Sequence, residues 1–224
     1  MNSPSRHLCH VLLLFGGCTL LFYLFPQLDI PVSSFFYNPL KGGFYLSETL
    51  PCRIIYISVE ILAACWSILS VALLIVTGIR RKPFGMLTLK RLIYLVAVLA
   101  IGPGLIVNVL LKDHWGRARP YTIQQFGGAS TFSPPYEISQ ECHHNCSFVS
   151  GHAAMAFYFI AFAFIFPVRR RQIAGITGLY SVVTGIVRIV QGGHFLSDVL
   201  FAYVIVYAIA ALLYDVMFER SSAG

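Results

Sequence analysis

A stretch near the C-terminal end, residues 187–198, carries side chains that an apolar segment does not need. It contains Arg188, Gly192, Gly193, His194 and Asp198. His194 and Asp198 are four residues apart, so on a helix they share one face, one turn from each other. A carboxylate placed there can accept one imidazole N–H and leave the other ring nitrogen free to attack. The stretch therefore predicts a nucleophilic histidine, although a snorkelling arginine and a helix-capping aspartate would leave a similar pattern.

The same stretch also suits a bound anion. The planar guanidinium of Arg188 offers a fork of donors that matches phosphate oxygens. Gly192 and Gly193 allow the backbone to come close to an anion. A nucleophile beside an anion site indicates chemistry at a phosphate group.

A second cluster, residues 112–120, holds three cations within eight residues: Lys112, Arg117 and Arg119. It follows directly on a long apolar run. One interpretation is an interfacial anchor, with Trp115 in the aromatic belt of a membrane protein. The other is an electropositive clamp for phosphate oxygens, because charge-assisted hydrogen bonds to phosphate are strong.

A third cluster, Ser147 to His152, stands directly before another apolar run. Ser150 is a natural helix N-cap. The first free N–H groups of a helix that begins here, together with its dipole, would favour an anion. His152 on the first turn could donate a proton to a leaving oxygen. The alternative is an ordinary cap followed by an interfacial histidine.

The amino-acid composition indicates the kind of fold that holds these clusters in place. The chain has 224 residues, of which 57% are hydrophobic and only 11% charged, and its mean hydropathy is +0.74. A soluble domain would have about a quarter of its residues charged, and several runs here reach the roughly 18 apolar residues that span a bilayer. We therefore expect one integral membrane domain, residues 1–224, of the all-α class, built as a six-transmembrane-helix bundle. The predicted spans are residues 8–25, 54–79, 92–111, 151–168, 173–187 and 199–218.

The distribution of lysine and arginine predicts the orientation. With six spans, ten of these residues fall on the side of the two termini and six on the other side. The excess of positive charge marks the cytoplasmic side, so both termini are expected there. The net charge of +7 is then explained by topology, and nucleic-acid binding is not needed. All three clusters are expected on the same, non-cytoplasmic face.

Taken together, the clusters resemble the type 2 phosphatidic acid phosphatase superfamily. The resemblance rests on three motifs in this order: Lys112-x6-Arg119-Pro120, Ser150-Gly151-His152 and Arg188-x5-His194-x3-Asp198. That superfamily usually has Pro before Ser-Gly-His and Ser before the third arginine, where this chain has Val149 and Val187. Neither change removes a group expected to transfer a proton or to attack phosphorus.

The resemblance implies a role for each matching residue. His194 would attack phosphorus and form a phosphohistidine, Asp198 would orient it, and His152 would protonate the leaving oxygen and then activate water. The phosphoryl oxygens would be held by Lys112, Arg119, Arg188 and the Ser150-Gly151 turn, with Arg117 as a candidate extra contact outside the motif. The resemblance implies no cofactor and no metal.

The chain is also similar to bacterial lipid A phosphatases, particularly the 4′-phosphatase group. The segments that carry this likeness are residues 101–104, 112–117, 145–149 and 191–195. It implies a metal-independent phosphomonoesterase in the bacterial inner membrane, with its site at the periplasmic face and the 4′-phosphate of lipid A as substrate. Loss of that phosphate would weaken binding of cationic antimicrobial peptides.

Other functions stay open on the sequence alone. The same chemistry could act on the 1-phosphate of lipid A, on undecaprenyl diphosphate or on phosphatidylglycerophosphate. A transporter or lipid-binding scaffold could use the basic clusters to hold a headgroup. The paired histidines, His152 and His194, argue against the last alternative, because binding alone needs cations and no nucleophile.

Two further features are ambiguous. Cys142-His143-His144-Asn145-Cys146 could ligate zinc, but outside the cytoplasm a local disulfide between Cys142 and Cys146 is favoured. Glu60 is an acid within the second predicted span, where such residues are often functional. A snorkelling or hydrogen-bonded glutamate is the alternative.

Overall fold

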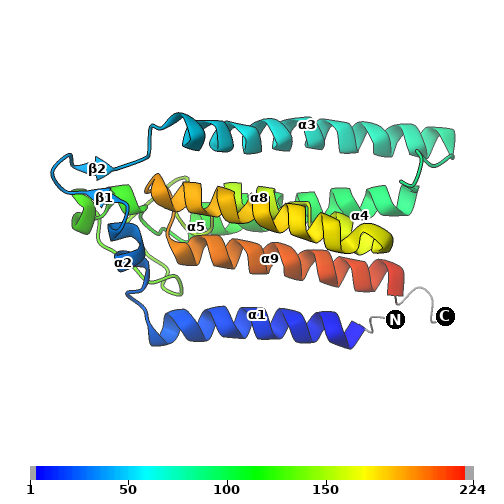
Figure 1. The fold of residues 1–224 in the computed structure, drawn as a ribbon. Helices are drawn as coiled ribbons and strands as arrows, with labels where there is room; N and C mark the ends of the chain where they lie inside the picture. The colour runs from blue at the N-terminus through cyan, green and yellow to red at the C-terminus, as the bar shows by residue number, and fades with distance from the viewer. Residues whose placement is uncertain (1–3, 220–224) are drawn as a thin grey trace.

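The computed structural model describes residues 4–219 and is dominated by helices (Figure 1). The long helical segments are α1 (Pro4–Leu24), α3 (Leu50–Arg80), α4 (Leu89–Leu99) with its π-helical continuation η1 (Ala100–Leu111), α6 (Gly151–Tyr158) with α7 (Ala161–Ile165), α8 (Arg170–Val190) and α9 (Leu196–Tyr214). The short helices are α2 (Asp29–Ser34), α5 (Lys112–His114), η2 (Pro120–Thr122), η3 (Gln124–Phe126), η4 (Pro167–Arg169) and η5 (Asp215–Glu219). Strands β1 (Tyr37–Asn38) and β2 (Gly43–Phe44) pair antiparallel, with Tyr37 opposite Phe44. The predicted all-α transmembrane bundle is confirmed.

Within the described residues, five helical segments are long and apolar enough to cross a membrane. They are Arg6–Leu24, Leu50–Arg80, Leu89–His114, Pro167–Val190 and Leu196–Glu219. The sixth, Gly151–Ile165, is shorter and is broken between α6 and α7. The expected span over residues 151–168 was too long, because Pro167 disfavours helical backbone at Phe166, whose φ and ψ are −121° and 73°.

The third span becomes π-helical around its Gly102-Pro103-Gly104 sequence. Pro103 has no backbone N–H and cannot continue a regular helical ladder. The wider turn of η1 accommodates it over Ala100–Leu111. The carbonyl of Pro103 accepts a hydrogen bond from the side-chain amide of Asn108 at 2.8 Å.

Helix α9 lies at the centre of the bundle and contacts α1, α4, α6 and α7. Its inward face is rich in small residues, including Ala202, Ala210 and Ala211, all buried, which lets neighbouring helices approach closely. Buried tyrosines supply polar links inside this apolar core. Tyr94 on α4 donates to the carbonyl of Ala210 at 3.0 Å, and Tyr158 on α6 donates to the carbonyl of Leu95 at 3.0 Å.

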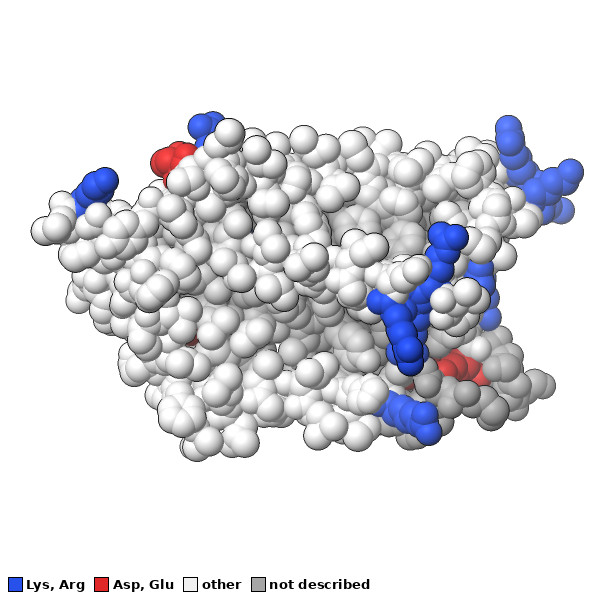
Figure 2. All heavy atoms as spheres, in the orientation of Figure 1, with Lys and Arg blue, Asp and Glu red and all other residues white. Residues whose placement is uncertain are grey.

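The two ends of the bundle differ in chemistry. One end carries α2, the β1–β2 hairpin, the long loop from residue 115 to 150 and the start of α9, and the chain termini lie at the other end (Figure 1). On the face shown in Figure 2, charged side chains gather at the two ends and leave an uncharged belt between them. The arginine- and lysine-rich turns, residues 80–82 and 169–171, belong to the termini end. Of the ten cations expected on that side, Arg220 lies outside the described residues.

Candidate active site

The three sequence clusters meet at the end of the bundle where α9 begins. The N–H of Ser150 donates to the carbonyl of Asp198 at 3.1 Å, and the N–H of Ser147 donates to the carbonyl of Arg117 at 2.8 Å. The N–H of Tyr121 donates to the carbonyl of Gly192 at 3.1 Å. These backbone bonds join the 115–150 loop to the α8–α9 turn, so residues 112–119, 147–152 and 188–198 form one site.

Arg117 lies at the base of this site and is fully buried, with 0% of its surface exposed. Its guanidinium donates to Asp198 at 2.6 Å, to Asp29 at 2.8 Å and to the hydroxyl of Ser197 at 2.7 Å. Its Nε donates to the carbonyl of Ser133 at 2.8 Å. The sequence-based suggestion that Arg117 contacts phosphate is therefore wrong, because these protein groups already occupy its donors.

Asp29 is the residue of this network that sequence reasoning missed. It is the first residue of α2 and is completely buried. Besides Arg117, it accepts the N–H of Ser197 at 2.9 Å and the hydroxyl of Ser197 at 2.5 Å. One feature of the sequence could have indicated Asp29, because it is the sole acidic residue among the first 47.

His194 stands directly above the network and is 1% exposed. Its Nδ1 lies 2.8 Å from the carbonyl oxygen of Ser147 and 3.7 Å from Oδ2 of Asp198. A carbonyl can only accept, so Nδ1 carries the proton and Nε2 carries the lone pair. The expected hydrogen bond from His194 to Asp198 is thus replaced by one to the Ser147 carbonyl.

Asp198 acts on His194 through its neighbours. Its Oδ2 accepts the hydroxyl of Ser147 at 2.5 Å and the N–H of Phe195 at 2.8 Å. The first bond holds the residue whose carbonyl orients the imidazole. The second satisfies a free donor at the start of α9, where a carboxylate is favoured by the helix dipole.

The charge state of His194 follows from its surroundings. Burial lowers its pKa to about 3; Arg188 and Arg119 act in the same direction and Asp198 opposes them. A buried imidazole is costly to protonate. His194 is therefore neutral near pH 7, and its Nε2 makes no hydrogen bond to any residue that the structure describes.

Three cations surround the histidines. The charges of Arg188, Lys112 and Arg119 all act on His152. Arg119 is held by Asn145, with its Nη2 2.8 Å from the backbone carbonyl and 2.9 Å from the side-chain oxygen. Arg188 donates to Gln191 at 2.5 Å. These partners leave donors of both arginines free to face a common anion.

Gly193 is required by the approach of Arg188. A Cβ at this position would come within 2.3 Å of Arg188 Nη2. Any other side chain would displace the guanidinium from the place where it faces the site. The sequence predicts that an anion comes close to the backbone at Gly192-Gly193. In the structure, the group that comes close to Gly193 is the guanidinium of Arg188.

Ser150 caps α6, and its polar groups are already engaged. Its hydroxyl accepts the N–H of Ala153 at 3.4 Å, and its own N–H is bound to Asp198 as described above. The first-turn donors that remain for an anion are the N–H groups of Gly151 and His152. A Cβ on Gly151 would lie 2.8 Å from the side-chain oxygen of Asn108 and 3.3 Å from Nζ of Lys112, so only glycine leaves room for both.

Helix α3 supplies two residues that the sequence motifs do not include. The ring of Tyr56 lies against His152, with centroids 4.2 Å apart, and Arg188 lies 4.9 Å from the same ring. Oε1 of Glu60 is 3.7 Å from Nε2 of His152. Glu60 is therefore a neighbour of the site.

A cavity of about 460 Å³ leads from the site into the apolar part of the bundle. Its polar end is formed by Lys112, His152, Asn108 and Glu60. The rest of its wall comes from α3, α4, η1 and α6, and its apolar part includes Val59, Ala63, Val71, Val96 and Leu99. A polar end continuous with an apolar wall fits an amphiphile whose headgroup reaches the cations and whose chains stay in the membrane.

A disulfide joins Cys142 and Cys146, whose Cα atoms are 5.6 Å apart. Both sulfurs are bonded to each other, so neither is a thiolate ligand for zinc. The loop they close contains Asn145, which holds Arg119 and whose own N–H donates to Asp113 at 3.3 Å. The segment thus positions a site cation.

Comparison with known proteins shows which family and which relatives the chain is similar to. Residues 91–222 match the family model described as the PAP2 superfamily. Over 203 residues, 89% of this chain and 90% of the relative, the chain is 34% identical to a "Lipid A 4'-phosphatase" of Francisella tularensis subsp. novicida (strain U112). It is 38% identical over 132 residues, 57% of each chain, to a "Lipid A 4'-phosphatase" of Rhizobium leguminosarum.

Among solved structures, the chain is similar to one titled "Crystal structure of the first transmembrane PAP2 type phosphatidylglycerolphosphate phosphatase from Bacillus subtilis". The TM-score is 0.51 and the identity 21%, with 100% of this chain and 98% of the other covered. At this identity the likeness concerns the fold.

The buried pair of Asp29 and Arg117 gives a test of stability. Asp29→Asn breaks one of the two buried ion pairs of Arg117 and places an NH2 group where Asp29 accepts hydrogen bonds from Arg117 and Ser197. Buried donors are then left without an acceptor, so the free energy of unfolding should fall by about 3 kcal/mol. Denaturation of the purified protein in detergent measures it. Glu48→Gln, which changes an exposed carboxylate at the same end, should have little effect. Equal losses in both variants would contradict the role assigned to Asp29.

Proposed function

The chain belongs to the PAP2 superfamily and is a lipid phosphatase, and from this premise we propose that it removes the 4′-phosphate of lipid A at the periplasmic face through a phosphohistidine on His194. One observation carries the mechanism. His194 is buried and neutral, with Nδ1 held by a carbonyl and Nε2 unengaged, beside the cationic groups of Arg188 and Arg119.

In the proposed first step, Nε2 of His194 attacks phosphorus and the bond to the sugar oxygen breaks. Lys112, Arg119 and Arg188, with the N–H groups of Gly151 and His152, balance the charge on the phosphoryl oxygens. His152 gives its proton to the leaving oxygen. The phosphate brings negative charge among three cations, which favours the protonated His152 that this step needs.

In the second step, water attacks the phosphohistidine. His152, now neutral, takes a proton from that water, phosphate leaves, and Nε2 of His194 regains its lone pair. The Ser147 carbonyl keeps the proton on Nδ1 through both steps. Asp198 and Glu60 lie near the two imidazoles and offset the positive charge that each one gains in turn.

Two features support lipid A as substrate. The relatives that match this chain over 89% and 57% of its length are both named as lipid A 4′-phosphatases. The cavity reaches from Lys112 and His152 to an apolar wall on α3 and α4, which suits a headgroup phosphate attached to acyl chains.

The orientation is proposed from charge. The turns at residues 80–82 and 169–171 place six lysine or arginine residues at the termini end. Positive charge is retained on the cytoplasmic side, which puts the site at the periplasmic face.

The mechanism predicts that His194→Gln lowers turnover at least about a thousandfold, because the variant keeps a polar group but has no nucleophile. Phosphate release from lipid A in detergent with EDTA measures this. His143→Gln, which changes an exposed histidine at the same end, is the matched control. Substantial residual turnover in His194→Gln would rule out the proposed nucleophile.

His152→Gln separates the two steps. With p-nitrophenyl phosphate as probe, the leaving group needs no proton, so phosphorylation of His194 should proceed while hydrolysis is slowed. A burst of about one equivalent of nitrophenol per enzyme is expected, followed by slow release. A linear time course without a burst would argue against the covalent intermediate.

Expression in a host with bis-phosphorylated lipid A tests the substrate. Mass spectrometry should show the loss of one phosphate, and fragmentation should place it on the distal sugar, with no change for His194→Gln. Loss from the proximal sugar would make the enzyme a 1-phosphatase. Unchanged lipid A with altered undecaprenyl or glycerophospholipid phosphates would overturn the substrate assignment.

Cysteine labelling tests the orientation. In a background with Cys9, Cys18, Cys52 and Cys65 replaced by alanine, Gln125→Cys in the 115–150 loop should react with an impermeant thiol reagent in intact spheroplasts. Gln172→Cys at the termini end should react only after lysis. The opposite pattern would invert the topology.

A further inference from the structure

A second hollow, separate from the site, lies at the termini end. It has a volume of about 840 Å³ and is walled by α7, α8, the start of α4 and the α3–α4 turn. That volume lies in the range of about 300–1,000 Å³ typical of ligand pockets. The α6–α7 segment that forms one wall begins at Gly151 beside the site and ends at Ile165, so the hollow is at the far end of this segment from the site.

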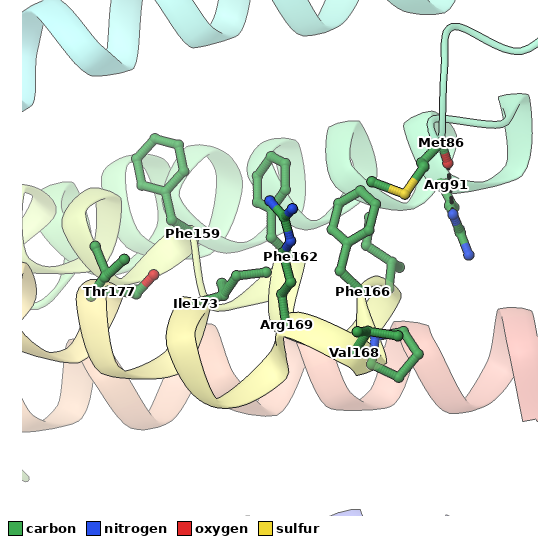
Figure 3. A pocket seen from close by; sticks show the side chains of 12 residues that line it. Met86, Arg91, Phe159, Phe162, Phe166, Val168, Arg169, Ile173 and Thr177 are labelled. Atoms are coloured by element: carbon green, nitrogen blue, oxygen red, sulfur yellow. Dashed lines mark hydrogen bonds between the residues drawn. The ribbon is translucent and has the colours of Figure 1, made fainter.

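The hollow lies along one side of the α6–α7 segment. The chain leaves the helix at Phe166 and Pro167, and α8 begins at Arg170 and returns beside α7. Phe159, Phe162 and Phe166 extend to the same side of the chain (Figure 3) and stack in sequence, with centroids 6.1 and 6.2 Å apart. Ile173 and Ile176 of α8 complete an apolar wall.

The polar rim of this groove is positive. Arg91 and Arg169 line it, and no acidic side chain is among its lining residues. Arg91 is held by a 2.6 Å hydrogen bond from Nη1 to the carbonyl of Met86, shown dashed in Figure 3, and lies 5.5 Å from the Phe166 ring. The side chain of Arg169 extends to the same side as the aromatic rings (Figure 3).

The groove continues into a polar hollow. A second space shares Pro167, Val168 and Arg169 with the groove and is also lined by Arg170 and Arg171. The side chains of Arg169 and Arg171 form no hydrogen bond or ion pair with any residue in the described part of the chain. The apolar groove therefore opens onto three consecutive arginines. It is complementary to a molecule that has acyl chains and a negatively charged headgroup.

We propose that this groove binds an anionic glycerophospholipid from the leaflet at the termini end. The acyl chains lie along Phe159, Phe162 and Phe166, and the phosphate meets Arg91 and Arg169 to Arg171. Basic pockets between spans recognise lipid headgroups by this charge and shape complementarity. The proposal does not depend on the catalytic assignment, because the groove and the site share no residue.

The bound lipid contacts the α6–α7 segment directly. It covers the aromatic side chains of this segment and the isoleucines of α8 that line the groove, so it stabilises the segment that starts with Ser150, Gly151 and His152. Occupancy should therefore raise the thermal stability of the whole bundle.

Thermal unfolding and native mass spectrometry of the full chain in detergent test the proposal. The probe is phosphatidylglycerol, with phosphatidylcholine of the same acyl chains as control. The phosphate of phosphatidylglycerol is a diester, which separates binding from phosphomonoester hydrolysis. Phosphatidylglycerol should raise the unfolding temperature and remain bound in the gas phase, and phosphatidylcholine should do so much less.

Two variants and one control locate the binding. Arg169→Gln with Arg171→Gln should weaken phosphatidylglycerol binding roughly tenfold or more, since each arginine near an anionic headgroup contributes. Ile173→Trp, which fills the groove without changing charge, should also abolish the stabilisation. Arg80→Gln with Lys82→Gln removes two cations at the same end that do not line the groove, and should leave binding unchanged.

Four results would overturn the proposal. They are equal stabilisation by the two lipids, equal weakening in the Arg80→Gln/Lys82→Gln control, unchanged binding in Ile173→Trp, and a lipid-free dimer seated through this face.

Discussion

The buried ion network of Asp29, Arg117 and Asp198 is the constraint on which the site depends. Placing one cation and two carboxylates where none is exposed costs several kcal/mol per ion, and the cost is offset only when every donor and acceptor is satisfied. Here Arg117 is satisfied by Asp29, Asp198, Ser197 and the Ser133 carbonyl. The network therefore admits one arrangement of α2, the 115–150 loop and the start of α9, and the position of His194 follows from it through Ser147.

The charged groups of the site form two layers, the buried ion network below and the cations around the two histidines above. The lower layer, formed by Arg117, Asp29 and Asp198, has one excess negative charge, because one arginine faces two carboxylates. The upper layer contains Lys112, Arg119 and Arg188 around two imidazoles. The upper layer is strongly positive until a phosphate enters. An anion that brings its own charge into such a place is bound tightly and also changes the protonation that its neighbours prefer. The negative charge of the phosphate is thus responsible both for its binding and for the protonation of the histidine that transfers a proton.

The short α6–α7 segment connects the two ends of the molecule. Its first turn supplies the N–H groups and the imidazole of the site, and its aromatic side chains line the groove at the termini end. Lipid therefore contacts this segment twice under our proposals, as substrate at one end and as a bound component of the bundle at the other.

The sequence by itself determined the transmembrane helix bundle, the approximate spans and the residues of the three clusters, because hydropathy and helix capping are local properties. It also placed the clusters on one face, because the number of spans decides which loops share a side. Only the tertiary structure decided that Arg117 is a buried ion partner, that Asp29 completes it and that the Ser147 carbonyl, in place of Asp198, receives the Nδ1 proton. It likewise added Tyr56 of α3, placed Glu60 beside His152, which decides between the alternatives that the sequence left open for this acid, and shortened the fourth span. These features depend on contacts between residues as distant as 29, 117 and 198, and no local pattern encodes which polar groups will meet when helices pack.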